Sequence, residues 1–345
     1  MRHPENWRRG RRRPPTSHGS PPIHKPHWKW LIISYFFLGG LSAGSYVVAT
    51  AAELFGRQED RAVTRVGRYL ALLALIPCPP LLILDLGRPE RFLYMLRVIK
   101  LRSPMSIGTW GLLTFSQFTM LSAARQAASD GVTWGPFRVV KRLPSHLIGL
   151  FGAVFGFFVG GYTGVLLGAT AVPLWARNAR LLGPLFLCSA LAAACSGISL
   201  VLALLPGRRH GSLQRLRRAE IVAATGELLA MIAMHFWSGH LGAPLTSGRL
   251  GRLHLGGSLW LGIVTPVLLH VVGNRLRLPH RLVTILASLA SLAGGLTVKY
   301  VMVMAGQVSA DDPGATFEFA GGSTPEPLTS DGHADRPESR IQAAP

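Results

Sequence analysis

Residues 145–171 read SHLIGLFGAVFGFFVGGYTGVLLGATA and contain no Asp, Glu, Lys or Arg. An α-helix rises about 1.5 Å per residue, so about 20 apolar residues cross the hydrocarbon core of a bilayer. The stretch also lacks the alternation of apolar and polar residues that a strand of a membrane barrel shows. It therefore predicts a transmembrane α-helix.

Seven more stretches of this kind divide the rest of the chain. The eight predicted spans are 30–54, 68–86, 106–124, 145–171, 181–205, 219–240, 255–276 and 282–305. Of all residues, 49% are hydrophobic and only 15% are charged, whereas about a quarter are charged in a soluble protein. The predicted fold class is all-α: a polytopic membrane protein of eight transmembrane helices.

Two polar tails flank these spans. Residues 1–27 are rich in Pro and Arg and lack the apolar stretch and small-residue cleavage site of a signal peptide. Residues 307–345 carry seven acidic residues against two arginines, with many Pro, Gly and Ser. Such compositions cannot bury enough apolar surface to fold, so we expect a disordered basic N-terminal tail and a disordered acidic C-terminal tail.

The charges and cysteines exclude several functions. The formal net charge is +20, but the basic residues lie in short clusters between apolar runs, so no nucleic-acid partner is predicted. Cys78, Cys188 and Cys195 include no CxxC pair, which argues against a zinc ribbon or a disulfide framework. An iron–sulfur cluster usually needs four thiolates. We therefore predict no metal site and no iron–sulfur cluster in this protein.

The sequence gives two conflicting indications of membrane orientation. We call the face with both ends of the polypeptide side A and the opposite face side B. Loops and adjoining helix ends carry nine Lys and Arg on side A and 16 on side B. The positive-inside rule then places side B in the cytoplasm, whereas the Arg-rich tail before the first span favours the reverse.

Glycine recurs every fourth residue in the span 145–171, at positions 152, 156, 160, 164 and 168. Small residues at this spacing let a neighbouring helix approach closely. The alternative is that the glycines leave room for a flat ligand.

Charged residues are costly inside a bilayer and tend to mark function. Three are predicted there: Asp85 at the side-A end of its span, Glu227 and Lys299. Glu53 and Glu220 are expected at the side-B ends of their spans, where water can reach them.

Several polar and aromatic residues of the first four spans are predicted at shallow depth below side A. They are Tyr35, Asp85, Trp110 and Tyr162. Hydroxyl groups, a carboxylate and aromatic rings suit a quinone head group, which accepts hydrogen bonds, stacks and exchanges protons. Alternatively, Tyr35 and Trp110 belong to the interfacial aromatic belt, and Asp85 pairs with Arg88 or Arg91.

The histidines argue against a bound haem. His235 and His270 are the intramembrane candidates for axial ligands, but they are predicted about 15 Å apart along the membrane normal. Glu227 has two interpretations: the middle of a proton path with His235, or a buried acid held neutral by a polar neighbour.

Six motifs occur in order along the sequence. They are YFFLGGLSAGSY at 35–46, LDLGRPERF at 84–92, SPMSIGTWGLLTF at 103–115, GGYTGVLL at 160–167, LWLGIVTPVLL at 259–269 and KYVMVMAGQ at 299–307. Together they resemble the NrfD/polysulfide-reductase membrane-subunit family over residues 28–308. Members of this family are the quinone-interacting anchors of molybdopterin and related respiratory complexes.

The resemblance implies two four-helix bundles, at 28–171 and 172–306, a quinone site in the first bundle and no haem. Tyr162 would hydrogen-bond the quinone, and Tyr35 stands where a known member has a histidine. Asp85 would exchange a proton or place Arg88, and Arg88 and Trp110 would also belong to the quinone site.

The resemblance also implies a ferredoxin-like partner with four iron–sulfur clusters. Beyond that partner would lie a catalytic subunit carrying molybdopterin or another centre. Ser103, Pro104, Trp110 and the 87–105 loop would form part of the docking surface. Side A, with the quinone site, would then face outward from the cell membrane.

We therefore expect a membrane subunit, not catalytic alone, that exchanges electrons between menaquinone or ubiquinone and its iron–sulfur partner. The alternatives are a haem-free ion- or proton-conducting transporter without quinone chemistry and a purely structural anchor. The substrate of the complex and the direction of electron flow are not encoded in these residues.

Overall fold

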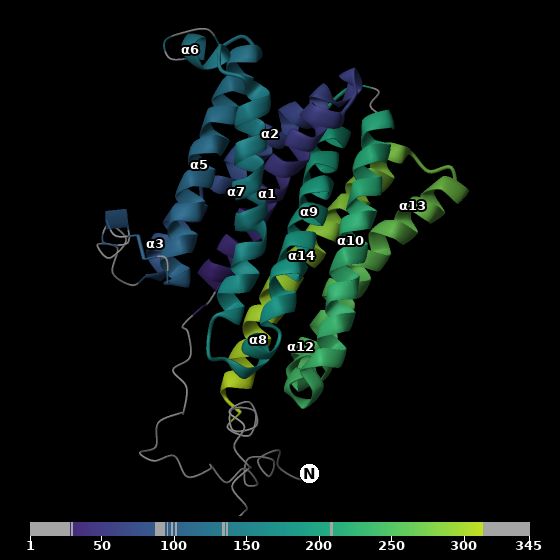
Figure 1. Ribbon diagram of the computed structural model, residues 1–345. Helices are drawn as coiled ribbons and strands as arrows, with labels where there is room; N and C mark the ends of the chain where they lie inside the picture. Colours follow the sequence, from purple (N-terminus) through teal and green to yellow (C-terminus); the bar gives the residue numbers. More distant parts are fainter. Residues whose placement is uncertain are drawn as a thin grey trace, which may run out of the picture.

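The computed structural model describes residues 28, 30–86, 94, 96, 97, 99, 100, 102–132, 135, 137–207 and 210–312. Within these residues the secondary structure consists of helices and turns (Figure 1). The predicted disordered tail 1–27, and residues 313–345 of the predicted tail 307–345, lie outside the described residues. Residues 307–310, predicted to begin the C-terminal tail, instead complete the last helix.

The long helices are α1 (Trp30–Phe55), α2 (Arg61–Leu75), α3 (Cys78–Asp85), α5 (Pro104–Ser129), α7 (Ser145–Gly168), α9 (Ala179–Leu204), α10 (His210–Ser238), α13 (Thr265–Arg275) and α14 (His280–Ala310). A π-helix, His254–Val264, precedes α13 directly. The short elements are η2 (Gln58–Asp60), α6 (Phe137–Lys141), α8 (Pro173–Arg177), η3 (Gly239–Gly242), α11 (Ala243–Thr246) and α12 (Gly248–Leu253).

Seven helical stretches among the described residues are long and apolar enough to cross a membrane. They are Trp30–Phe55, Gln58–Asp85, Ser145–Gly168, Ala179–Leu204, His210–Thr246, Gly248–Arg275 and His280–Ala310. They confirm an all-α, multi-pass membrane protein and correspond to seven of the eight predicted spans. The remaining predicted span, 106–124, forms α5, which has 26 residues but is less apolar.

Two predicted spans differ from the observed helices for local reasons. The span predicted at 68–86 begins at Arg61 and is interrupted between α2 and α3. Pro77 lies at this interruption. Proline interrupts a helix because it lacks an N–H group and its ring clashes with the preceding turn. The span predicted at 219–240 begins at His210, because arginine is a good helix former and extends the helix outward.

The earlier start of α10 corrects the expectation for Glu220. This residue lies ten positions inside the helix and is buried, 9% exposed, rather than at a water-accessible helix end. Ser196 Oγ donates a hydrogen bond to Glu220 Oε1 over 2.6 Å. Glu53 lies near the end of α1 and is partly exposed, as expected, and Arg68, itself buried, donates a hydrogen bond to its carboxylate.

Helix α9 lies at the centre of the helix assembly. It packs against α1, α7, α10 and α14, and α1 packs in turn against α2 and α7 (Figure 1). A Cβ atom at Gly44 of α1 would lie 2.8 Å from the Cβ of Ala194, closer than real Cβ atoms approach. We call residues 28–171, which run through α7, the first half of the protein and residues 172–312 the second half. The two halves join in part through close contact between α1 and α9, where a Cβ atom at Gly44 would also overlap the backbone of Ala190.

The glycine ridge of α7 serves the same kind of packing. Gly152 faces the ring of Tyr46 on α1, Gly164 faces the backbone of Leu182 on α9, and Gly168 faces Ala179. Added Cβ atoms at these positions would overlap their neighbours. This confirms the packing interpretation of the ridge.

Candidate functional site

A cavity of about 270 Å³ opens among α1, α3, α5 and α7 at the end of the assembly that we call side A. We name it the side-A pocket. It is lined by Trp28, Ile32, Tyr35, Phe36, Leu82, Asp85, Leu86, Met105, Gly108, Thr109, Leu112, Tyr162 and Leu166. The structure thus brings together three predicted site residues, Tyr35, Asp85 and Tyr162, from three different helices.

Tyr162 is held firmly at the wall between α5 and α7. Its hydroxyl donates a hydrogen bond to the backbone carbonyl of Pro104, and its ring stacks on Phe158 with centroids 5.1 Å apart. Gly108 faces the same ring so closely that a Cβ atom there would overlap it. Since the hydroxyl hydrogen is used by Pro104, the oxygen is left to accept a hydrogen bond.

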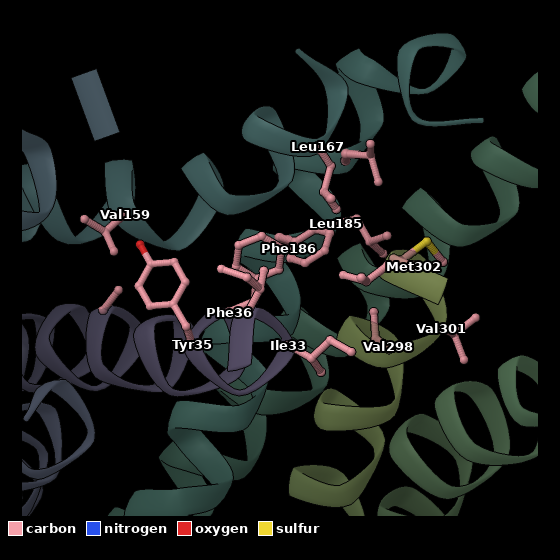
Figure 2. Packing of buried hydrophobic residues seen from close by; sticks show 14 of the residues in the cluster. Ile33, Tyr35, Phe36, Val159, Leu167, Leu185, Phe186, Val298, Val301 and Met302 are labelled. Atoms are coloured by element: carbon pink, nitrogen blue, oxygen red, sulfur yellow. The ribbon is translucent and has the colours of Figure 1, made fainter. Parts of the chain in front are cut away.

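Tyr35 presents a different situation on α1. The side chain is 5% exposed, and its hydroxyl forms no hydrogen bond with a described residue. Figure 2 shows this hydroxyl pointing away from α1, toward the helix that carries Val159. It lies near enough to Tyr162 and the Cys78 thiol to interact electrostatically with both. Tyr35 therefore offers the pocket an uncommitted donor.

Asp85 ends α3 and forms a half-buried acidic part of the pocket lining. Within the described part of the protein it forms neither a hydrogen bond nor an ion pair. Arg88, predicted to be placed by Asp85 or to bind the cofactor, lies outside the described residues, as does Arg91. Their pairing with Asp85 thus stays a prediction.

Trp110 is near the pocket but does not line it. Its indole Nε1 is buried and lacks a hydrogen-bond partner among the described atoms. Instead, Met105, Gly108 and Leu112 of α5 face the cavity. Their spacing of three and four residues is that of one helix face, and this periodicity could have identified them from the sequence.

Two aromatic contacts connect the side-A pocket to the second half of the protein. The ring of Phe36 meets that of Phe186 on α9 edge-on, with centroids 6.0 Å apart (Figure 2). Trp28 stacks on Trp175 of α8, whose Nε1 donates to the carbonyl of Met302 on α14 over 2.8 Å. The pocket wall is therefore in direct contact with α8 and α9, and through Trp175 it is linked to α14.

Two buried ionisable side chains of the second half lie close to each other. Glu227 of α10 is 5% exposed and Lys299 of α14 is 2% exposed, and the two interact electrostatically. Lys299 Nζ also donates to the carbonyl of Phe186 over 3.3 Å. Sequence reasoning identified each residue but not their proximity, since helices α10 and α14 are far apart in the sequence.

His235, predicted to share a proton path with Glu227, lies eight residues further along α10, toward side A. It is exposed and lines a cavity of about 260 Å³ at side A, together with His240 and His254. His270 lines a different cavity near side B. Among the described residues, no three His, Cys, Asp or Glu side chains gather closely enough to hold a metal ion.

The fold and the pocket define a multi-pass helical membrane protein with an interhelical site at one end. The profile of the family described as "Polysulphide reductase, NrfD" matches residues 21–310. The protein belongs to this family, which confirms the resemblance carried by the six motifs.

Named relatives agree with this assignment. Over 306 residues, the sequence is 28% identical to a polysulfide reductase chain from Wolinella succinogenes, and the match covers 81% of this protein and 94% of that one. It is 27% identical over 321 residues to protein NrfD of Escherichia coli, covering 82% and 95%. A shorter match of 97 residues, 29% identical, covers 28% of this protein and 22% of a selenate reductase subunit from Mesobacillus selenatarsenatis.

Proposed function

We propose that the protein is the membrane subunit of a respiratory oxidoreductase complex and exchanges electrons between the quinone pool and an iron–sulfur partner. The side-A pocket would be the quinone site. The observation that carries this proposal is the meeting of Tyr35, Asp85 and Tyr162 around one largely apolar cavity. Such cavities, with few convergent polar groups, are typical of small-molecule sites.

The polar groups of the pocket match both states of a quinone. The Tyr162 oxygen, its hydrogen given to Pro104, can accept a hydrogen bond from a quinol hydroxyl. The uncommitted hydroxyl of Tyr35 can donate to a quinone carbonyl. Oxidation of a quinol releases two electrons and two protons, and the Asp85 carboxylate would take one of these protons.

Helix α5 would be the eighth membrane span. Hydroxyl-bearing residues lower its hydropathy, but several of them are hydrogen-bonded within the protein. Ser116 donates to the carbonyl of Leu112 over 2.7 Å, and Thr119 donates to that of Phe115 over 2.9 Å. Ser122 shares a hydrogen bond of 2.8 Å with the Tyr46 hydroxyl. Because these hydroxyl groups are satisfied within the protein, they do not prevent the helix from crossing a bilayer.

With eight spans, residues 28–171 and 172–306 would form the two predicted four-helix bundles. The quinone site then belongs to the first bundle. Side A would face outward, with the 87–105 loop, Ser103 and Pro104 at the surface that receives the iron–sulfur subunit. Trp110, behind the pocket wall, would belong to the same surface.

The relatives' names support a multi-subunit assembly, since one is named as a single chain and another as a single subunit of a reductase. The partner would be a ferredoxin-like subunit with four iron–sulfur clusters. It would pass electrons to or from a catalytic subunit carrying molybdopterin or another centre. The quinone would be menaquinone or ubiquinone.

The direct test is binding of a hydroxyquinoline-oxide inhibitor to the purified protein, followed by fluorescence quenching. We expect saturable binding that weakens in Tyr162→Phe and in Asp85→Asn. Tyr69→Phe is the matched control, because the Tyr69 hydroxyl bonds to Asp130 over 2.6 Å at the opposite end of the assembly. Unchanged affinity in both pocket variants would refute the assignment of the pocket.

A second candidate function is ion or proton conduction without quinone chemistry. The buried pair of Glu227 and Lys299 favours it. The same binding experiment separates the two, because only the quinone function requires the side-A pocket to bind the inhibitor.

A further inference from the structure

Two acidic residues of the second half lie on one face of α10. Glu220 and Glu227 are seven residues apart, which is two helical turns, or about 10 Å along the axis. Both are buried, 9% and 5% exposed. Burying two carboxyl groups inside a membrane protein is energetically unfavourable. Neither residue belongs to the proposed quinone site.

The groups that face Glu227 come from two other helices. Lys299 projects from α14, and Cys188 and Ser189 project from α9. A Cβ atom at Gly226 would lie 2.8 Å from Cys188 Sγ. The absence of a side chain at this position therefore lets α10 approach α9 closely beside Glu227. The carboxyl, amine, thiol and hydroxyl groups thus gather where three helices meet.

This cluster is not packed as a purely structural ion pair. Glu227 and Lys299 interact electrostatically but do not form a direct ion pair. The hydroxyl of Ser189 is buried beside Glu227 and is its hydrogen-bonding neighbour. A buried ion pair that stabilises a fold is usually in direct contact, whereas a hydroxyl that both donates and accepts can relay a proton between two separated groups.

A cavity approaches the cluster from side B. It measures about 80 Å³ and is lined in part by Arg217, Glu220, Ala224, His270 and Asn274. Ala224 precedes Glu227 by three residues, so the cavity ends about one helical turn, or about 5 Å along the axis, from the cluster. Glu220 and His270 are titratable groups at this entrance.

A second cavity approaches from side A. It measures about 260 Å³ and includes Met231, His235, Ser238, His254 and Met302 in its lining. Met231 follows Glu227 by four residues and Met302 follows Lys299 by three, again about one helical turn. The Nδ1 atom of His254 is buried there without a hydrogen-bond partner in the described part of the protein.

We propose that α9, α10 and α14 carry a proton path through the second half of the protein, with Glu227 and Lys299 as the relay between the two cavities. A proton from the side-B cavity adds to the Glu227 carboxylate. The carboxylic acid then passes it through the Ser189 hydroxyl to the unprotonated Lys299 amine, and the resulting ammonium releases it to the side-A cavity. One proton enters for each that leaves, both groups return to their starting states, and no electrons move.

The path is tested with the full-length protein in liposomes that contain a pH-sensitive dye, under a potassium diffusion potential set with valinomycin. We expect proton flux above that of protein-free liposomes. Glu227→Gln and Lys299→Met should each reduce it by about 10²-fold, the lower end of what a positioned proton-transfer group contributes. Glu59→Gln is the matched control, because Glu59 is an exposed carboxylate outside the path.

Inhibitor binding and monodispersity are measured in the same samples to show whether each variant is folded. If Glu227→Gln does not fold, Glu220→Gln decides the question, since its amide oxygen can still accept the hydrogen bond from Ser196. Flux no higher than in protein-free liposomes, or equal flux in folded relay variants and wild type, would overturn the proposal. Flux that depends on Glu227 without inhibitor binding would support the path and refute the quinone function instead.

Discussion

The Nζ atom of Lys299 lies 3.9 Å from the centroid of the Phe186 ring and donates a hydrogen bond to the carbonyl of the same residue. An amine over an aromatic face is stabilised by the ring quadrupole when it is charged. Phe186 also touches Phe36, which lines the side-A pocket. One aromatic side chain therefore contacts both the wall of the proposed quinone site and the relay amine.

Lys299 and Glu227 should be energetically coupled. Removing either one leaves the other buried with less compensation, which costs roughly 1–3 kcal/mol. We expect Lys299→Met and Glu227→Gln each to lower the thermal unfolding temperature in detergent, and the double variant to recover much of the loss. If the two losses simply add in the double variant, the residues do not interact as described.

The sequence predicts the spans well because length and hydropathy are local properties. It does not predict that Glu220 is buried, because the start of α10 depends on arginines that a hydropathy profile counts as loop. The sequence assigns Trp110 to the site only through its predicted depth in the membrane. The helix periodicity of α5 instead directs Met105 and Gly108 toward the cavity. The proximity of Glu227 to Lys299 depends on how α9, α10 and α14 pack, and spacing within one helix cannot show it.

Gly108 should be required for the shape of the side-A pocket. A methyl group at this position would overlap the Tyr162 ring, and overpacking of this kind typically costs about 1–3 kcal/mol. We expect Gly108→Ala to lower the unfolding temperature and weaken inhibitor binding together. Gly256→Ala is the control, since a Cβ atom there meets no neighbour within 4 Å. Normal inhibitor affinity in Gly108→Ala would show that Tyr162 can move without affecting the site.

Two tyrosines of α1 should respond oppositely to loss of the hydroxyl. Tyr46 is fully buried, and its hydroxyl bonds to Ser122 and to the carbonyl of Ile148, each over 2.8 Å. Tyr46→Phe should therefore cost about 1–3 kcal/mol of stability and leave inhibitor affinity unchanged.

Tyr35→Phe should leave stability unchanged, because the Tyr35 hydroxyl has no partner among the described residues to lose. If this hydroxyl donates to the bound head group, its removal should weaken inhibitor binding by about 1 kcal/mol, or roughly fivefold. Unfolding temperature and binding are measured for both variants. A Tyr35→Phe variant that binds as well as wild type would show that this hydroxyl does not contact the ligand.

Gly44 should be essential for joining the two halves of the protein. It sits opposite the backbone of Ala190 and the side chain of Ala194 on α9, and small residues at such contacts let helix backbones approach closely. Gly44→Val would force α1 away from α9 and cost more than the typical overpacking penalty of about 1–3 kcal/mol, because backbone cannot yield as a flexible side chain does.

We expect this variant to lose inhibitor binding and proton flux together, since Phe36 and Phe186 meet across the same interface. Gly256→Ala, in open space, again serves as the control. Loss of only one activity in Gly44→Val would show that the pocket and the relay keep their structures independently of this contact.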